Sequence, residues 1–216
     1  MYNNRRIKIL LVVSQALFII AAFLFCFTAY IVTHRQQIKV DAIIFAWLQL
    51  IRSSLMTRFM RTITFFGSRY FLFPCYSLLV IYYLFIRKKL WFAVALALTG
   101  FLGNQLLYLM QDVFKRIRPA DPLVNYINEY GYPSGHSFAS FVFAGLLSFI
   151  ICQKHLQTTL KLVAGIILFI IVSIIAISRA YLHVHYPTDV LGGFYLAVLW
   201  LMPCLWILYF VNHKYR

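Results

Sequence analysis

The sequence predicts an all-α, polytopic membrane protein with six transmembrane helices in one bundle, and three observations lead to this fold class. Hydrophobic residues make up 63% of the 216 residues and charged residues only 12%, whereas soluble domains contain about 25% charged residues. Several apolar runs approach or exceed the length that a helix needs to cross the hydrocarbon core, about 20 residues. These runs lack the alternation of a β-strand, and only helices or closed barrels satisfy their backbone in lipid.

The six predicted spans are stretches with few or no charged residues. The first and third are charge-free, the second has Pro74 near its start, and the last contains Pro203. The fourth and fifth are shorter and have to extend into their flanks. The first stretch shows no cleavage site between small residues, so we interpret it as a span and not as a signal peptide. We place the spans at residues 9–32, 70–86, 90–111, 137–153, 162–178 and 190–212, within one domain that covers residues 1–216.

The segment between the first two spans predicts a short interfacial helix. Its apolar run Ala42–Ile51 has ten residues, which is too few for a span and typical of an interfacial or re-entrant helix. We interpret the arginines that follow as a surface for lipid headgroups rather than for substrate recognition. These arginines are Arg52, Arg58, Arg61 and Arg69.

The charges predict the orientation in the membrane. Lysine and arginine outnumber the acidic residues by 20 to 5, which gives a formal net charge of +15. In a chain of apolar spans this excess favours anionic lipid headgroups or a phosphate-bearing substrate over nucleic acid. Short basic loops are typical of the cytoplasmic side. We therefore expect both termini and the loops after the second and fourth spans to be cytoplasmic, while the loops with all five acidic residues face outward.

Three polar clusters fall at the outward ends of the spans. Lys115–Pro119 follows the third span, Tyr132–Ser137 opens the fourth, and Ser178–Asp189 joins the fifth to the sixth. Because polar and ionisable groups at membrane depth are costly, their convergence at one end of a bundle indicates a functional site.

The first two clusters suit an anionic ligand. Arg118 and Arg179 can each bind phosphate oxygens through paired, charge-assisted hydrogen bonds. The Pro-Ser-Gly-His sequence predicts a helix start, where Gly135 allows close approach of the backbone and the free N–H groups of the first turn point at an anion. His136 would then lie beside the anion as a proton donor.

The third cluster suits nucleophilic catalysis. His185 and Asp189 are four residues apart, and a carboxylate that holds one imidazole nitrogen leaves the other free to attack phosphorus. Two histidines with two arginines predict phosphoryl transfer without a metal ion. The four cysteines have no metal-ligand spacing, and we interpret them as buried small hydrophobic residues. We predict no metal and no cofactor.

Each cluster taken alone has an ordinary structural explanation. An Arg-Pro pair at a helix end is often a charge that sets topology, Pro-Ser-Gly is often a turn, and His-x3-Asp is often a satisfied polar pair. The order of the three clusters and their shared side of the membrane favour one site over three coincidences.

The three clusters resemble the motifs of the type-2 phosphatidic acid phosphatase superfamily, whose fold is shared with vanadium haloperoxidases. The motifs of that family are Lys-x6-Arg-Pro, Pro-Ser-Gly-His and Ser-Arg-x5-His-x3-Asp. The second is complete at residues 133–136, and the third is complete from Ser178 to Asp189. The first is present at Arg118-Pro119, but the family lysine falls on Gln111.

The resemblance implies a role for each matching residue. His185 would be the nucleophile that forms a phosphohistidine, Asp189 its orienting partner, and His136 the general acid. The phosphate would be held by Arg118, Arg179, Ser134 and Gly135. Gln111 offers only a neutral amide where the family has a cation, and we hypothesise that Lys115, one helical turn later, reaches into the site instead.

The resemblance also implies a function. We expect a metal-independent lipid phosphatase of a bacterial inner membrane, with its active site facing the periplasm or the cell exterior. The expected substrates are undecaprenyl diphosphate, phosphatidylglycerophosphate, phosphatidic acid or lipid A phosphates. A lipid phosphotransferase with the same site is one alternative, and a non-enzymatic lipid transporter or scaffold is another, although no inverted repeat supports a transporter. A soluble-substrate phosphatase would not need six spans. The sequence leaves the oligomeric state open.

Overall fold

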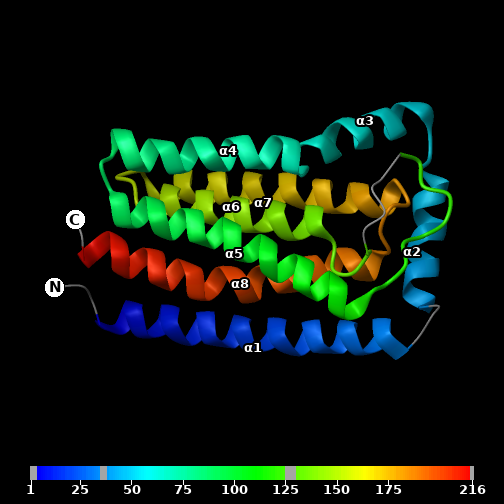
Figure 1. Cartoon of the computed structure of the whole chain (residues 1–216), viewed down its shortest axis with the longest axis horizontal. Coiled ribbons are helices and arrows are strands. Elements are labelled where there is room, and N and C mark those ends of the chain that lie inside the picture. Colours follow the sequence, from blue (N-terminus) through cyan, green and yellow to red (C-terminus); the bar gives the residue numbers. More distant parts are fainter. Residues whose placement is uncertain (1–3, 35–37, 125–129, 215–216) are drawn as a thin grey trace.

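The structure, a computed structural model, describes residues 4–34, 38–124 and 130–214. Within these ranges the chain forms eight α-helices and one π-helical turn and contains no strand. Figure 1 shows the long helices side by side, with both termini near one end of the bundle and α2 lying across the other end. The predicted all-α membrane fold is confirmed.

Six segments are long and apolar enough to cross a membrane, as predicted. The helices that form them are α1 (Asn4–His34), α4 (Arg69–Ile81) with the π-helical turn η1 (Tyr82–Ile86), α5 (Leu90–Phe114), α6 (Gly135–Cys152), α7 (Thr158–Tyr181) and α8 (Pro187–Lys214). By length and composition the second candidate span also includes the helix before α4 and runs over Ser54–Ile86.

Several helices extend beyond the predicted bounds at the end of the bundle that carries α2. α5 continues to Phe114 rather than residue 111, α7 continues to Tyr181 rather than 178, and α8 begins at Pro187 rather than 190. Polar residues inside these extensions are buried, among them Arg179, Thr188 and Asp189. The fifth span was expected to extend into its flanks, and at this end of the bundle the polar side chains are accommodated within the protein instead of ending the helix.

Two short helices, not one, separate α1 from α4. They are α2 (Lys39–Leu50) and α3 (Ser54–Phe65). α3 begins where Ser53 accepts a hydrogen bond from the Met56 N–H at 3.1 Å, an ordinary N-cap. Met60 on the buried face of α3 packs with Tyr181, Leu182 and Val184. The predicted Ala42–Ile51 run thus forms most of α2, and α3 covers the end of α7.

The core lies where α5, α6 and α8 meet. Leu96, Leu146 and Leu208 are fully buried there, while many large apolar side chains elsewhere are exposed, as on a surface that faces lipid. Because lipid removes the hydrophobic drive between helices, close contact at small residues contributes to packing. A Cβ on Gly103 would lie 2.6 Å from Trp200 Nε1, so only glycine lets α8 approach α5 at this point.

Candidate active site

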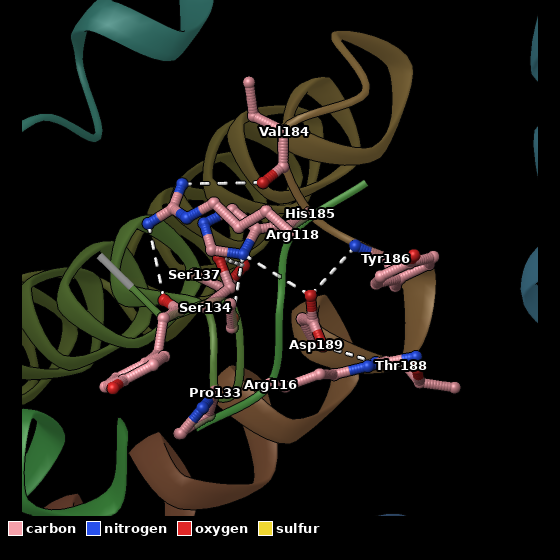
Figure 2. A network of polar contacts seen from close by, with 12 residues as sticks. Arg116, Arg118, Pro133, Ser134, Ser137, Val184, His185, Tyr186, Thr188 and Asp189 are labelled. Carbon is pink, nitrogen blue, oxygen red and sulfur yellow. Dashed lines mark hydrogen bonds and ion pairs between the residues drawn. The ribbon is translucent and has the colours of Figure 1, made fainter. Parts of the chain in front are cut away.

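The three predicted clusters come together at the end of the bundle where α2 lies (Figure 1). α5 and α7 end there, and α6 and α8 begin there. Figure 2 shows His185 between the Arg118 guanidinium and Asp189, with Ser134 and Ser137 of α6 nearby. Ser134 is linked directly to the third cluster, because its N–H donates to the Asp189 carbonyl at 3.0 Å.

His185 lies in the turn between α7 and α8 and is only 1% exposed. Its Nδ1 is 2.8 Å from the Gly131 carbonyl oxygen and 3.6 Å from Asp189 Oδ2. A carbonyl oxygen only accepts hydrogen bonds, so Nδ1 carries the proton and Nε2 of the neutral ring has a free lone pair. The tautomer of His185 is therefore set by a backbone carbonyl, and the Asp189 carboxylate lies beside the ring as a charge.

The charge state of His185 follows from its surroundings. Burial lowers its pKa to about 4, the Asp189 carboxylate opposes this, and the Arg118 and Arg179 charges lower it further. The imidazole is thus neutral at pH 7, which is the form that a nucleophile requires.

Asp189 is fully buried in the first turn of α8. Its Oδ2 accepts the Tyr186 N–H at 2.9 Å, and its Oδ1 accepts a hydrogen bond from Arg116 Nη1. The other terminal nitrogen of Arg116, Nη2, pairs with Asp41 of α2 at 2.9 Å. Arg116 and Asp41 were missed by the sequence analysis. Arg116 belongs to the first cluster, but the sequence analysis assigned roles only to its neighbours. Asp41 is a single acidic residue beside an apolar run, and no motif indicated a role for it.

The start of α6 forms a cradle of backbone N–H groups. Ser134 precedes the helix in an extended conformation and is fully buried, and Ser137 Oγ donates to Ser134 Oγ at 3.3 Å. A Cβ on Gly135 would lie 3.2 Å from Leu107 of α5, and the predicted approach of this backbone to an anion stays a prediction. The free N–H groups of this first turn suit an anion.

The two motif arginines border this cradle. Arg118 donates to the Val184 carbonyl at 3.4 Å. Arg179, only 6% exposed, donates from Nη1 to Thr64 Oγ1 at 2.8 Å. Its buried Nε has no hydrogen-bond partner among the described residues. A buried donor left unpaired is costly, so an oxygen of a bound anion would satisfy it.

His136 lies in the first turn of α6 and is partly exposed. The turn between α3 and α4 passes beside it, since a Cβ on Gly67 would lie 3.4 Å from His136 Cδ2. His136, the predicted general acid, is thus less buried than His185, the predicted nucleophile.

Gln111 and Lys115 take different positions. Gln111 is buried, and its Nε2 donates to the Pro133 carbonyl at 3.0 Å, so its amide holds the loop that leads into α6. Lys115 is exposed at the end of α5 with a left-handed backbone (φ 45°). The hypothesis that Lys115 reaches the phosphate stays a prediction.

The fold is that of a multi-pass membrane protein, and the three motifs bring buried histidine, aspartate and arginine side chains together at one end of it. The chain belongs to the PAP2 superfamily, whose family model matches residues 88–213. The predicted resemblance is therefore confirmed.

Relatives of known structure or name support this membership. The chain is 31% identical over 151 residues to phosphatidylglycerophosphatase B of Bacillus subtilis (strain 168), covering 69% of this chain and 74% of the relative. It resembles the crystal structure of a transmembrane PAP2-type phosphatidylglycerolphosphate phosphatase from Bacillus subtilis with a TM-score of 0.76 and 27% identity, covering 94% and 97% of the two chains. Aquifex aeolicus LpxE, at 24% identity and a TM-score of 0.61 over 79% of this chain and 97% of its own, shares the fold. Family and relatives together indicate a membrane-embedded lipid phosphatase.

Proposed function

We propose that this chain removes a terminal phosphate from a membrane lipid through a phosphohistidine formed on His185. The observation that carries the proposal is the hydrogen bond from His185 Nδ1 to the Gly131 carbonyl, at 2.8 Å. It leaves Nε2 unprotonated in a buried ring next to two arginines. A neutral imidazole held in one tautomer beside cations is suited to attack a phosphate ester.

In the first step, His185 Nε2 attacks phosphorus in line with the ester oxygen. The N–P bond forms as the P–O bond to the lipid breaks, and His136 donates a proton to the departing oxygen. Arg118 and Arg179 balance the charge on the phosphoryl oxygens. The positive charge that develops on the imidazole faces the Gly131 carbonyl and the Asp189 carboxylate, which both stabilise it.

In the second step, water replaces His185 on phosphorus. His136, now the base, takes a proton from the water as its oxygen bonds to phosphorus and the N–P bond breaks. The products are inorganic phosphate and neutral His185. The arginines supply the positive charge that a metal ion provides in other phosphatases, so the proposed reaction is metal-independent.

The proposed substrate class is a lipid with a terminal phosphate or diphosphate. The site lies at the end of the bundle, where the lipid-facing helices finish (Figure 1), and headgroups lie at this depth. Phosphatidylglycerophosphate is the first substrate to test, because the Bacillus subtilis relatives are named for it. Undecaprenyl diphosphate, phosphatidic acid and lipid A phosphates complete the panel.

We propose that the site faces outward and that both termini are cytoplasmic. The termini lie at the opposite end of the bundle from α2 (Figure 1). The loop of Arg87, Lys88 and Lys89 lies at that same end, and basic loops favour the cytoplasm.

The test is phosphate release by the purified chain in detergent with EDTA present. We expect release from at least one lipid of the panel, and we expect His185→Ala to abolish it, by about 10⁴-fold or more, as for other nucleophiles that act with a partner base. His155→Ala, at an exposed histidine near the opposite end, is the matched control and should retain full activity.

Two outcomes would redirect the proposal. Release only after an acceptor lipid is added would identify a phosphotransferase that uses the same phosphohistidine. Lipid movement across vesicles without phosphate release, and unchanged in His185→Ala, would identify a transporter.

A further inference from the structure

Asp41 is the buried residue of a helix whose other residues are exposed or half-buried. It is 3% exposed, and it is the one residue of α2 that is buried, whereas Ile43, Trp47 and Leu50 of the same helix are 58%, 71% and 85% exposed. A carboxylate is costly to bury unless it is paired and hydrogen-bonded. Its partners therefore help to hold α2 in place, together with the packing of Leu48 against the cluster around Met60 and of Phe45 against His183.

Those partners are the start of α8 and Arg116. Asp41 Oδ1 accepts the Thr188 N–H at 2.9 Å, and Oδ2 accepts from Thr188 Oγ1 at 2.8 Å and from Arg116 Nη2 at 2.9 Å. Thr188 immediately precedes Asp189. Asp41 thus satisfies a free N–H of the first turn of α8 from another helix.

Arg116 connects Asp41 to the catalytic carboxylate. Its Nη1 donates to Thr188 Oγ1 at 2.7 Å and to Asp189 Oδ1. The guanidinium also lies 4.1 Å above the centre of the Tyr186 ring, a cation–π contact that fixes its plane. Figure 2 shows Arg116 reaching from the loop after α5 toward Asp189 and Thr188.

Both the charges and the geometry of this cluster of side chains bear on His185. One arginine stands between two carboxylates, and the exposed fractions of the three side chains are 9% for Arg116, 4% for Asp41 and 0% for Asp189. With Asp41 these three side chains sum to one negative charge, which opposes the positive charges of Arg118 and Arg179 at His185, and without Asp41 they sum to zero. A negative surrounding favours the imidazole as it becomes positive on phosphorylation.

We infer that Asp41 and Arg116 are positioning residues: Arg116 orients Asp189, and Asp41 offsets the charge of Arg116, so that this cluster keeps one negative charge opposite the phosphorylated His185. This inference rests on the proposed phosphohistidine reaction, and it assigns to the interfacial helix α2 a part in catalysis.

The first test is Asp41→Asn in the purified full-length chain, reconstituted in vesicles with the best lipid substrate. The asparagine keeps the size and one acceptor oxygen but removes the charge. We expect kcat to fall about tenfold or more, the size found for outer partners of catalytic groups, while KM changes less than about threefold because the effect arises after binding. The matched control Asp112→Asn, at an exposed acid of α5, should leave both constants unchanged.

The second test separates catalysis from folding by the pH profile. Asp189, Arg118, Arg179 and His136 are the charged or titratable groups that face His185. Loss of the Asp41 charge makes the field at His185 more positive, so the acid limb of kcat/KM should move to lower pH. A change in the amount of folded protein would lower the whole profile without moving it.

The third test asks whether Asp41 acts through Arg116. Arg116→Lys should retain more activity than Arg116→Gln, because the ammonium can still donate a charge-assisted hydrogen bond to Asp189. The double variant Asp41→Asn with Arg116→Gln should be no slower than Arg116→Gln alone. If Asp41→Asn does not fold, Asp41→Glu and Arg116→Lys are compared instead, and both should lower kcat.

Clear outcomes would overturn the inference. Unchanged kcat and pH profile in folded Asp41→Asn, or in the substitute pair, would overturn the positioning role, and fully additive losses would overturn the path through Arg116. A wild-type chain that releases no phosphate would instead overturn the proposed function. In that case an NMR titration of isotope-labelled His185 still tests the inference, which fails if Asp41→Asn leaves the His185 pKa unchanged.

Discussion

The two ends of the bundle use similar side chains in different ways. At the site end, Asp189 and His185 are buried and fixed by neighbouring groups. At the opposite end, Lys161 Nζ binds the Cys152 carbonyl at 2.9 Å and closes the end of α6, and Lys88 is exposed. Positive charge at the opposite end caps a helix and, in the proposed orientation, favours the cytoplasmic side, and for both purposes lysine and arginine are interchangeable. At the site end, the proposed reaction depends on which charged residue stands at each position. Substitutions there should therefore lower activity far more than substitutions at the opposite end.

After His185→Ala, the substitution expected to lower activity most is at Arg179. Its unpaired Nε and the buried guanidinium would bind the phosphoryl oxygens, so Arg179→Gln should lower kcat/KM by about 10²–10³-fold, the effect of removing one donor to a developing charge. Steady-state phosphate release measures this. Arg58→Gln on the exposed face of α3 is the control. Equal activities of Arg179→Gln and Arg58→Gln would show that the phosphate does not bind at Arg179.

Asp189→Asn should have a smaller effect than the same change in a Ser-His-Asp triad. In such triads the carboxylate fixes the tautomer and its loss costs about 10⁴-fold in kcat. Here the Gly131 carbonyl accepts from Nδ1 at 2.8 Å and keeps the tautomer, so we expect a loss of about 10²-fold, the lower part of the range for such catalytic groups. A loss as large as that of His185→Ala would show that the carboxylate, and not the carbonyl, sets the tautomer.

The stability of the chain should fall as the pH falls below neutral. The folded-state pKa of His185 is about 4 because of burial, whereas an unfolded histidine has a pKa of about 6.5. Between these values the unfolded chain binds more protons, so the free energy of unfolding decreases from pH 6.5 to pH 4. Thermal unfolding in detergent at steps of pH measures the slope. His185→Asn should reduce the slope and His155→Asn should not, and equal slopes would argue against a neutral buried His185.

The smallest effect is expected at Lys115. Because its side chain is exposed, Lys115→Gln should lower kcat/KM by less than about threefold, as for a surface charge. Lys88 is a matched control at the opposite end, since it is also exposed and also has a positive φ, 52° against 45°. A loss of tenfold or more at Lys115 alone would confirm the hypothesis that it replaces the cation missing at Gln111.

The sequence predicted the spans and the motifs because both are local patterns. Apolar length indicates a span, and Ser178, Arg179, His185 and Asp189 stand within one short stretch. Asp41 could not be assigned in this way, because Thr188 and Arg116, its partners, lie 147 and 75 positions away. The role of the Gly131 carbonyl could not be predicted either, because every residue has a backbone carbonyl and the residue type does not show which one accepts a hydrogen bond. Gln111 could be identified as a departure from the family motif, but only the structure shows its hydrogen bond to Pro133.

The distance in sequence between Asp41 and its partners bears on how the chain is made. Asp41 leaves the ribosome well before Arg116 and Thr188 exist, so its carboxylate has no partner while the middle spans are inserted. A position at the membrane surface keeps it in contact with water during this interval, at little free-energy cost. The two hydrogen bonds from Thr188 to Asp41 therefore have to wait for α8. The start of α8 supplies both Asp189 and these hydrogen bonds to α2, so a chain truncated before α8 would form neither.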